Sequence, residues 1–239
     1  MNIIFQVFFG FITGYLIASW IESFMHEYVS DALPRYVRVW KRFPRLCKYM
    51  INTYYSHHTI HHVKTYRQDH VTQFRSEEEK QRLIDELAAR GPHGDIIIKS
   101  AFATRLAGIG ALVFVSPLLV AMPILYVLFD WPGIVAGSLA MALPPFMSHF
   151  VHAYLHKPFA YGQEHAPAWL TFLLSTAYGR AVYRNHFMHH KYGGTSNFNL
   201  VLGADYLRNR ERKVNQKDLN GMILAGMPLP SDMKTQNNP

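Results

Sequence analysis

Histidines are grouped in this sequence at spacings that suit metal binding. Two clusters have the pattern His-x-x-His-His and a third is His-x-x-x-His; their members are His58, His61, His62, His152, His156, His186, His189 and His190. On a helix, residues three or four apart share a face, whereas adjacent residues diverge by about 100°. One His-x-x-His-His cluster can therefore offer nitrogens to two neighbouring metal ions.

A ninth histidine, His26, stands at the end of a long apolar segment. Nine imidazoles exceed the four ligands of a structural zinc site and suit a dinuclear centre. Imidazole accepts zinc, copper, iron and nickel, and neutral imidazole binds a metal without burying an anion. Soluble di-iron bundles rely mainly on carboxylates, so we expect a centre that is unusually rich in histidine.

Three apolar segments must position these clusters. Residues 3–21, 107–129 and 133–155 each extend over about 20 residues, enough to cross a hydrocarbon core of about 30 Å. Residues 130–132 are expected to join the last two as a hairpin. The first segment is interpreted as a retained span, because no basic region precedes it and Glu22 and His26 stand where a signal peptide would carry small residues.

Basic residues predict which side of the membrane holds the histidines. Residues 35–48 carry six Lys or Arg and no acid, residues 208–217 are basic overall, and the loop 130–132 has no basic residue. The positive-inside rule then places residues 22–106 and 157–239 in the cytoplasm. A bacterial inner membrane and the endoplasmic reticulum both fit. Nucleic-acid binding explains the net charge of +8 less well than membrane spans do.

The sequence thus predicts an all-α integral membrane protein. About three transmembrane helices carry a cytosolic helical cap that holds a histidine-rich dinuclear metal site. Residues 1–228 are expected to form a single membrane-embedded domain, and residues 229–239 a disordered tail rich in Pro, Asn and Lys. A single cysteine, Cys47, excludes an intramolecular disulfide and an iron–sulfur cluster.

Three polar residues beside the clusters are candidates for supporting catalysis. His149 lies three residues before His152 on the same predicted helix face, where it could relay protons or orient a ligand. Glu22 shares a face with His26 and could accept a hydrogen bond from its ring; the alternative is a glutamate that reaches the membrane surface. Asn185 could hydrogen-bond a ligand of the last cluster. We assign no ligand role to the remaining histidines, which are His57, His70, His93 and His165.

The order of the clusters resembles that of the fatty acid hydroxylase/sterol desaturase superfamily of membrane di-iron oxygenases. That family shows His-x-x-x-His or His-x-x-x-x-His, then His-x-x-His-His, His-x-x-x-His and His-x-x-His-His. The last three match here residue by residue, and Asn197, Phe198 and Asp205 resemble the family's pattern after the final cluster. The resemblance follows motif order through nearly the whole chain, with motifs that are specific only in combination.

The first motif departs from the family pattern. Asp31 stands five residues after His26, where the family commonly has histidine. Asp31 could replace that imidazole as an oxygen ligand; alternatively it ends the helix. A carboxylate ligand would lower the potential of its metal.

The resemblance implies a hydroxylase-like domain and an O2-dependent oxidoreductase with two non-haem irons, in which zinc would reflect mis-metallation. It would hydroxylate or desaturate a C–H bond of a lipid-like or other hydrophobic substrate. The chain has no flavin, haem or iron–sulfur motif, so we expect an external electron donor of the cytochrome b5 or ferredoxin type. The alternative is a membrane protein with structural zinc or a metal-transport role and no redox chemistry.

Overall fold

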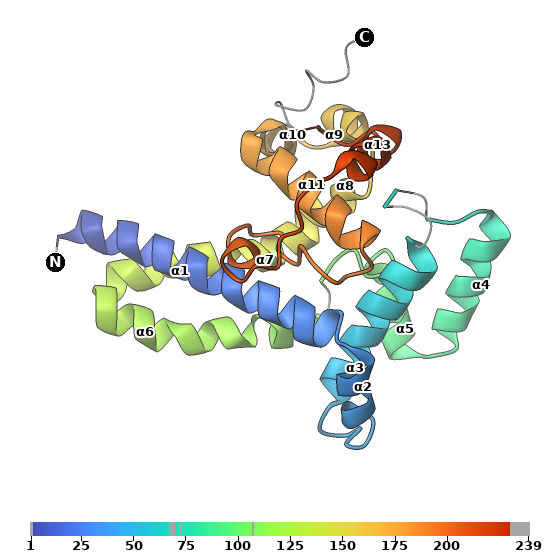
Figure 1. Cartoon of the computed structure of the whole chain (residues 1–239). Helices are drawn as coiled ribbons and strands as arrows, with labels where there is room; N and C mark the ends of the chain where they lie inside the picture. Colours follow the sequence, from blue (N-terminus) through green and yellow to red (C-terminus); the bar gives the residue numbers. More distant parts are fainter. Residues whose placement is uncertain (1, 67–69, 72, 107, 230–239) are drawn as a thin grey trace, which may run out of the picture.

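The computed structural model describes residues 2–66, 70–71, 73–106 and 108–229. The fold is all-helical, as predicted, and the described residues contain no strand. Figure 1 shows two long helical elements that extend together from a group of shorter helices.

Helix bounds follow the chain in this order: α1 (Ile3–Met25), η1 (His26–Ser30), α2 (Pro34–Trp40), α3 (Lys48–Tyr54), η2 (Tyr55–Thr65), α4 (Glu77–Ala88), α5 (Pro92–Lys99), α6 (Gly108–Met141), α7 (Leu143–Phe146), η3 (Met147–Val151), α8 (His152–Leu155), α9 (Phe159–His165), α10 (Ala168–Ser175), α11 (Ala177–Lys191), α12 (Ala204–Leu207) and α13 (Gln216–Leu224). The elements named η are π-helices, in which each backbone N–H bonds the carbonyl five residues earlier.

Small residues let α1 and α6 approach closely. Gly10 and Gly14 are buried on α1 and lie against Gly133 and Gly137 of α6. A Cβ added to Gly14 would lie 2.4 Å from the Gly137 carbonyl oxygen, so only glycine fits at this contact. Pairs of small residues four apart are typical of helices packed within membranes. Figure 1 shows α1 and α6 side by side.

Two helical stretches are long and apolar enough to cross a membrane. They are Ile3–Ser30 and Ser116–Leu155, and most of their apolar windows are not buried by other parts of the described chain. Large apolar side chains such as Phe8, Leu119 and Val127 are instead exposed. Exposed apolar surface on this scale indicates a lipid or protein partner. The structure thus gives two candidate spans where the sequence predicted three.

Asp130 interrupts the second candidate span. Its backbone has a φ of 58° and a ψ of −165°, so the helical path breaks inside α6. In Figure 1 the chain reverses direction within α6, which forms a hairpin. Leu125 from one arm contacts Gly137 from the other.

The shorter helices form two apolar cores beside the histidines. The larger core joins α8, α10, α11 and α13 through buried residues that include Leu155, Leu174, Tyr183, Met188 and Met222. A smaller core packs α4 and α5 against Ile60 of η2. These contacts hold η2 and α11, which carry the two His-x-x-His-His clusters. In the predicted tail at 229–239, Leu229 packs against the larger core, and residues 230–239 lie outside the described residues.

Candidate metal centre

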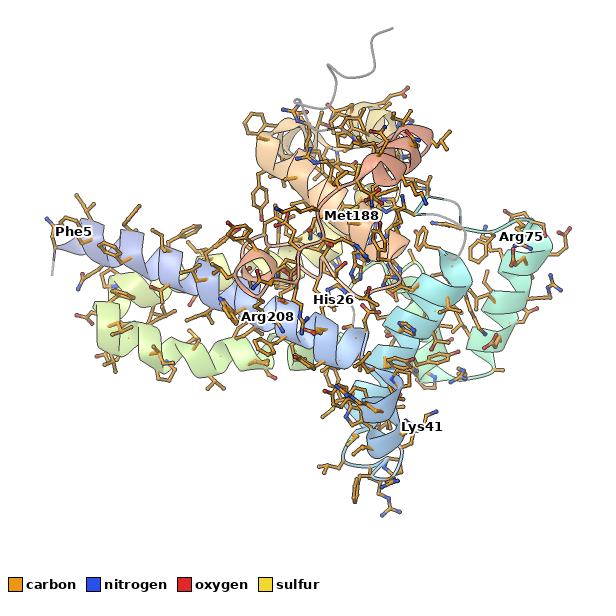
Figure 2. All side chains as sticks on the ribbon, viewed as in Figure 1. Phe5, His26, Lys41, Arg75, Met188 and Arg208 are labelled. Carbon is orange, nitrogen blue, oxygen red and sulfur yellow. The ribbon has the colours of Figure 1, made fainter. Side chains whose placement is uncertain are left out.

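Two groups of side chains meet between η1, η2, α8 and α11, and either group could hold a metal ion. In each group the ligand atoms all lie within 4.8 Å of one another. The five-histidine group contains His61, His152, His156, His186 and His190. The Asp31 group contains His26, Asp31, His57 and His189. Figure 2 shows His26 where α1 meets the helices that carry the other histidines.

Nitrogen atoms in the five-histidine group approach one another closely. Nε2 of His186 lies 3.0 Å from Nε2 of His152 and 2.9 Å from Nε2 of His156. Nε2 of His61 lies 3.2 Å from Nε2 of His190. All but His190 are fully or almost fully buried.

Those separations suit ligands of a shared ion. With metal–nitrogen bonds of about 2.1 Å, two nitrogens on one ion are about 3.0 Å apart at right angles and about 3.4 Å apart at the tetrahedral angle. A neutral imidazole has one N–H donor, so five rings cannot satisfy one another through Nε2 alone. The arrangement is therefore one of converging lone pairs.

Backbone carbonyls fix the orientation of several rings. Nδ1 of His152 lies 2.8 Å from the carbonyl oxygen of Thr104, and Nδ1 of His156 lies 2.8 Å from that of His70. In the Asp31 group, Nδ1 of His189 lies 2.8 Å from the Ser196 carbonyl oxygen. A ring that donates from Nδ1 keeps a lone pair on Nε2, which is how metal-binding histidines are commonly held.

The Asp31 group places one carboxylate among imidazoles. Oδ2 of Asp31 lies 3.2 Å from Nε2 of His57 and 3.3 Å from Nε2 of His189. It is buried and makes no hydrogen bond of acceptable geometry with the described residues. Nε2 of His26 is 2.9 Å from Nε2 of His57. A buried carboxylate oxygen that faces ring nitrogens without bonding them suits a metal ligand.

The two groups differ in charge. Burial lowers the pKa of His61, His186 and His190 well below the usual value, so these rings are neutral at pH 7. Burial opposes ionisation of Asp31, but the neighbouring His62 and His57 hold the pKa of its carboxyl well below the ordinary range. The five-histidine group is therefore uncharged. In the Asp31 group, burial opposes protonation of His189, but its interaction with Asp31 outweighs burial and raises the pKa of that ring. The Asp31 group therefore combines one anionic oxygen with an imidazole that is protonated more readily than the rings of the other group.

Two predicted ligands lie beside these groups. Nε2 of His62 is 3.1 Å from Nε2 of both His57 and His189, and its ring stacks on His190, so it lies between the groups. His58 has a half-exposed side chain, and its Nδ1 is 3.0 Å from Oδ1 of Asp31. His58 therefore contacts the carboxylate and does not converge with either group.

The three supporting residues predicted from the sequence have other contacts. Exposed His149 lies outside both groups and places Nδ1 3.4 Å from the Leu106 carbonyl oxygen. The Glu22 carboxylate does not hydrogen-bond the His26 ring; it accepts from the Val201 amide at 2.8 Å and from Asn199.

Asn185 also holds the loop that follows α11. Its Nδ2 donates to the carbonyl oxygens of Asn197 and Asn199, and its Oδ1 accepts from Nδ2 of Asn197. Asp205 accepts from Ser23 on α1 and from the Asn199 amide. Together these residues tie α1, which leads to His26, to the loop after His190.

His57 was assigned no ligand role from the sequence, yet it lies in the Asp31 group. His57 and His62 are five residues apart, a spacing that an α-helix places on different faces and a π-helix brings together. The π-helical geometry of η1 likewise brings Asp31 near His26, because the Asp31 amide donates to the His26 carbonyl oxygen at 2.8 Å. The spacing of these residues in the sequence does not predict a π-helix.

Of the other histidines without an assigned role, His93 and His165 lie outside both groups, and the ring of His70 contacts His156 and His186.

A cavity of about 720 Å³ opens beside the two groups. Its lining includes His26 and His57 of the Asp31 group and His152 of the five-histidine group, so it reaches both. Much of the remaining wall is apolar. Pockets of this size and character commonly accept small hydrophobic molecules.

Comparison with known proteins does not identify the chain. No family model matches the sequence, and neither a curated protein nor a solved structure matches it.

Proposed function

We propose that this chain is a membrane di-iron oxygenase that hydroxylates or desaturates a C–H bond of a hydrophobic substrate. The observation that supports it best is the pair of adjacent ligand groups, which share an apolar cavity. A structural metal site needs no such access, since structural zinc sites are closed by four protein ligands. The family resemblance of the histidine clusters supports the same reaction class.

The two ligand groups would provide two metal positions with different ligands. The five-histidine group offers neutral nitrogens, and Asp31 offers one anionic oxygen to the second position. Adjacent residues connect them, because His189 lies in the Asp31 group and His190 in the five-histidine group. Two irons held there would supply O2 reduction and C–H oxidation.

Electron balance requires a partner. In hydroxylation, one atom of O2 enters the substrate and the other leaves as water, while a donor supplies two electrons and two protons. In desaturation the substrate loses two hydrogens, the donor again supplies two electrons and two protons, and both oxygen atoms leave as water. We propose a cytochrome b5-like or ferredoxin-type donor, because the sequence has no flavin, haem or iron–sulfur motif.

The proposed setting is a membrane with the metal groups at its cytoplasmic edge. The break at Asp130 would divide the second candidate span into two crossings, giving three spans in all. The helices around the metal groups would then form the cytosolic cap. Substrate would enter from the bilayer, which favours lipid-like molecules.

Metal content tests the proposal directly. Protein purified anaerobically in detergent from cells supplied with iron-57 should contain about two coupled irons per chain by Mössbauer spectroscopy. His186→Ala should remove iron from the five-histidine group, whereas His165→Ala should not, since His165 is half-exposed and outside both groups.

Oxygen uptake is the second readout. Iron-loaded wild type should consume O2 in the presence of a reductant and a hydrophobic substrate. Two results together would contradict the oxygenase: bound zinc that anaerobic ferrous iron cannot replace, and no O2 uptake after reconstitution. The metal site would then be structural.

A further inference from the structure

The lining of the cavity beside the metal groups combines two chemically different sets of residues. One set consists of candidate metal ligands, among them the buried His152. Its lining also contains Arg45, Lys48 and Arg105, whose side chains are exposed. Apolar residues such as Ile96 line the wall. A molecule that fills this cavity would therefore meet both candidate metal ligands and cations.

Those three cations are available to a ligand. None of them forms an ion pair with a carboxylate among the described residues. Glu22 is the single carboxylate among the described lining residues, and it is occupied by the Val201 amide and Asn199. The described lining therefore contains three exposed cations that no carboxylate neutralises.

The three cations come from distant parts of the sequence, and the fold brings them to the lining of one cavity. Arg45 and Lys48 precede and begin α3, whereas Arg105 follows α5 and lies near the start of α6. His93 of α5 also lines the cavity, and burial together with the charges of Arg90 and Lys48 lowers its pKa. Burial is the larger cause of that shift, and the two cations add to it.

We propose that Arg45, Lys48 and Arg105 form an anionic head-group site, and that the substrate is an amphiphile with a carboxylate or phosphate at one end. The head group would bind the cations, and the hydrocarbon chain would extend toward His26, His57 and His152. The identification of this ligand as substrate rests on the proposed function; its binding does not. A neutral sterol or carotenoid would leave the three charges without a partner.

Binding of matched sixteen-carbon probes tests the head-group site. Metal-loaded protein in phosphatidylcholine nanodiscs would be titrated with radiolabelled palmitate, hexadecyl phosphate or hexadecanol. We expect the two anions to bind at least about 10-fold more tightly than the neutral alcohol, since charge-assisted hydrogen bonds are stronger than neutral ones. The relative affinity of palmitate and hexadecyl phosphate shows which anion the site prefers. Equal binding of all three probes would overturn the proposal.

Substitutions of the cavity cations test whether these residues bind the anionic head group. Arg45→Gln and Arg105→Gln should each weaken palmitate binding about 3- to 10-fold, a modest effect because both side chains are partly hydrated. Hexadecanol binding should not change. Lys41→Gln is the matched control: Lys41 belongs to the same basic segment, lies outside the cavity lining, and is labelled on the projecting α2–α3 region in Figure 2. An equal loss in the control would show a general surface effect and refute the site.

Spin-labelled stearates test the orientation. With paramagnetic Co²⁺ in the metal groups, a nitroxide near the chain terminus should be broadened more strongly than one near the carboxylate. The reverse order, or no difference, would overturn the proposed orientation. Both experiments are independent of turnover: oriented binding without O2 uptake would refute the oxygenase alone, whereas O2-dependent oxidation with no effect of the three cations would refute the head-group site alone.

Discussion

Nε2 of His57 lies 3.1 Å from Nε2 of His62, although the two residues are five apart in the sequence. The π-helix η2 creates this proximity, since its hydrogen bonds join residues five apart. His61, between them, turns to the five-histidine group. One helix thereby supplies both groups, and π-helical segments are often found at functional sites.

His57→Ala should weaken metal binding at the Asp31 group by more than about 10-fold. Loss of a residue that orients a ligand commonly lowers metal affinity about 10- to 100-fold, and loss of a ligand itself should lower it at least as much. The five-histidine group should keep its metal. Isothermal titration of the metal-free protein with Co²⁺ would then show one tight site in place of two. His93→Ala is the control, since His93 lies outside both groups. Two unchanged sites in His57→Ala would contradict the assignment.

Asp31→Asn preserves the size of the side chain and removes its charge. We expect metal affinity at the Asp31 group to fall about 10-fold or more, because Asp31 is the one carboxylate in that group. In an iron-loaded protein the reduction potential of that position should rise. Sequential metal titration and spectroelectrochemistry would measure both changes, with exposed Asp95→Asn as the control. An unchanged titration would show that Asp31 is no ligand.

Gly14→Leu should separate α1 from α6. The Gly14 Cα hydrogen faces backbone, and a Cβ would lie 2.6 Å from the Gly137 Cα, so the helices must move apart. Overpacking of this kind costs about 1–3 kcal/mol of folding free energy. Thermal unfolding in detergent should show a lower midpoint for Gly14→Leu. Leu16→Ala, at a more exposed position on the same helix, should have a smaller effect; the opposite order would exclude this interface.

Asn185→Ala should loosen the loop after α11 without removing a ligand. The substitution leaves the Asn199 carbonyl oxygen, which Asn185 bonds at 2.6 Å, without this donor. An unsatisfied buried polar group costs about 1–3 kcal/mol. Hydrogen exchange should increase over residues 197–205, and metal affinity should fall less than in His57→Ala. A complete loss of metal with no change in exchange would indicate a direct ligand role instead.

Asp218→Asn should destabilise the contact between α13 and α11 in a pH-dependent way. Oδ1 of Asp218 accepts from Lys191 at 2.9 Å and from Tyr192 at 2.8 Å. Burial opposes ionisation, but Lys191 and the Asn215 amide outweigh it and lower the pKa of Asp218. A lowered folded-state pKa gives stability that is present above the unfolded value of about 3.9 and is lost as pH falls through the folded value.

The measurable quantity is the difference in unfolding free energy between wild type and Asp218→Asn. It should be about 1–2 kcal/mol near pH 7 and should shrink below about pH 4. Urea unfolding at a series of pH values would measure it. Exposed Glu211→Gln should show no such trend. A difference that grows in acid would contradict the ion pair.

The sequence determined the helical class and the approximate apolar segments, because apolar runs of about 20 residues have few other stable arrangements. It also determined that histidines would lie on helix faces at metal-binding intervals. It did not show how many apolar segments cross a membrane, because one backbone break at Asp130 changes the count.

Tertiary structure decided which side chains meet. The spacing argument treated His58 as a ligand and gave no ligand role to His57, which lies outside the three clusters. The hydrogen bonds of η2 place His57 in the Asp31 group and leave His58 against the carboxylate. Glu22 and Asn185 were assigned to the histidines by proximity in sequence. Both bind the loop that follows α11, because unpaired backbone groups in that buried loop need partners that only the folded chain brings near.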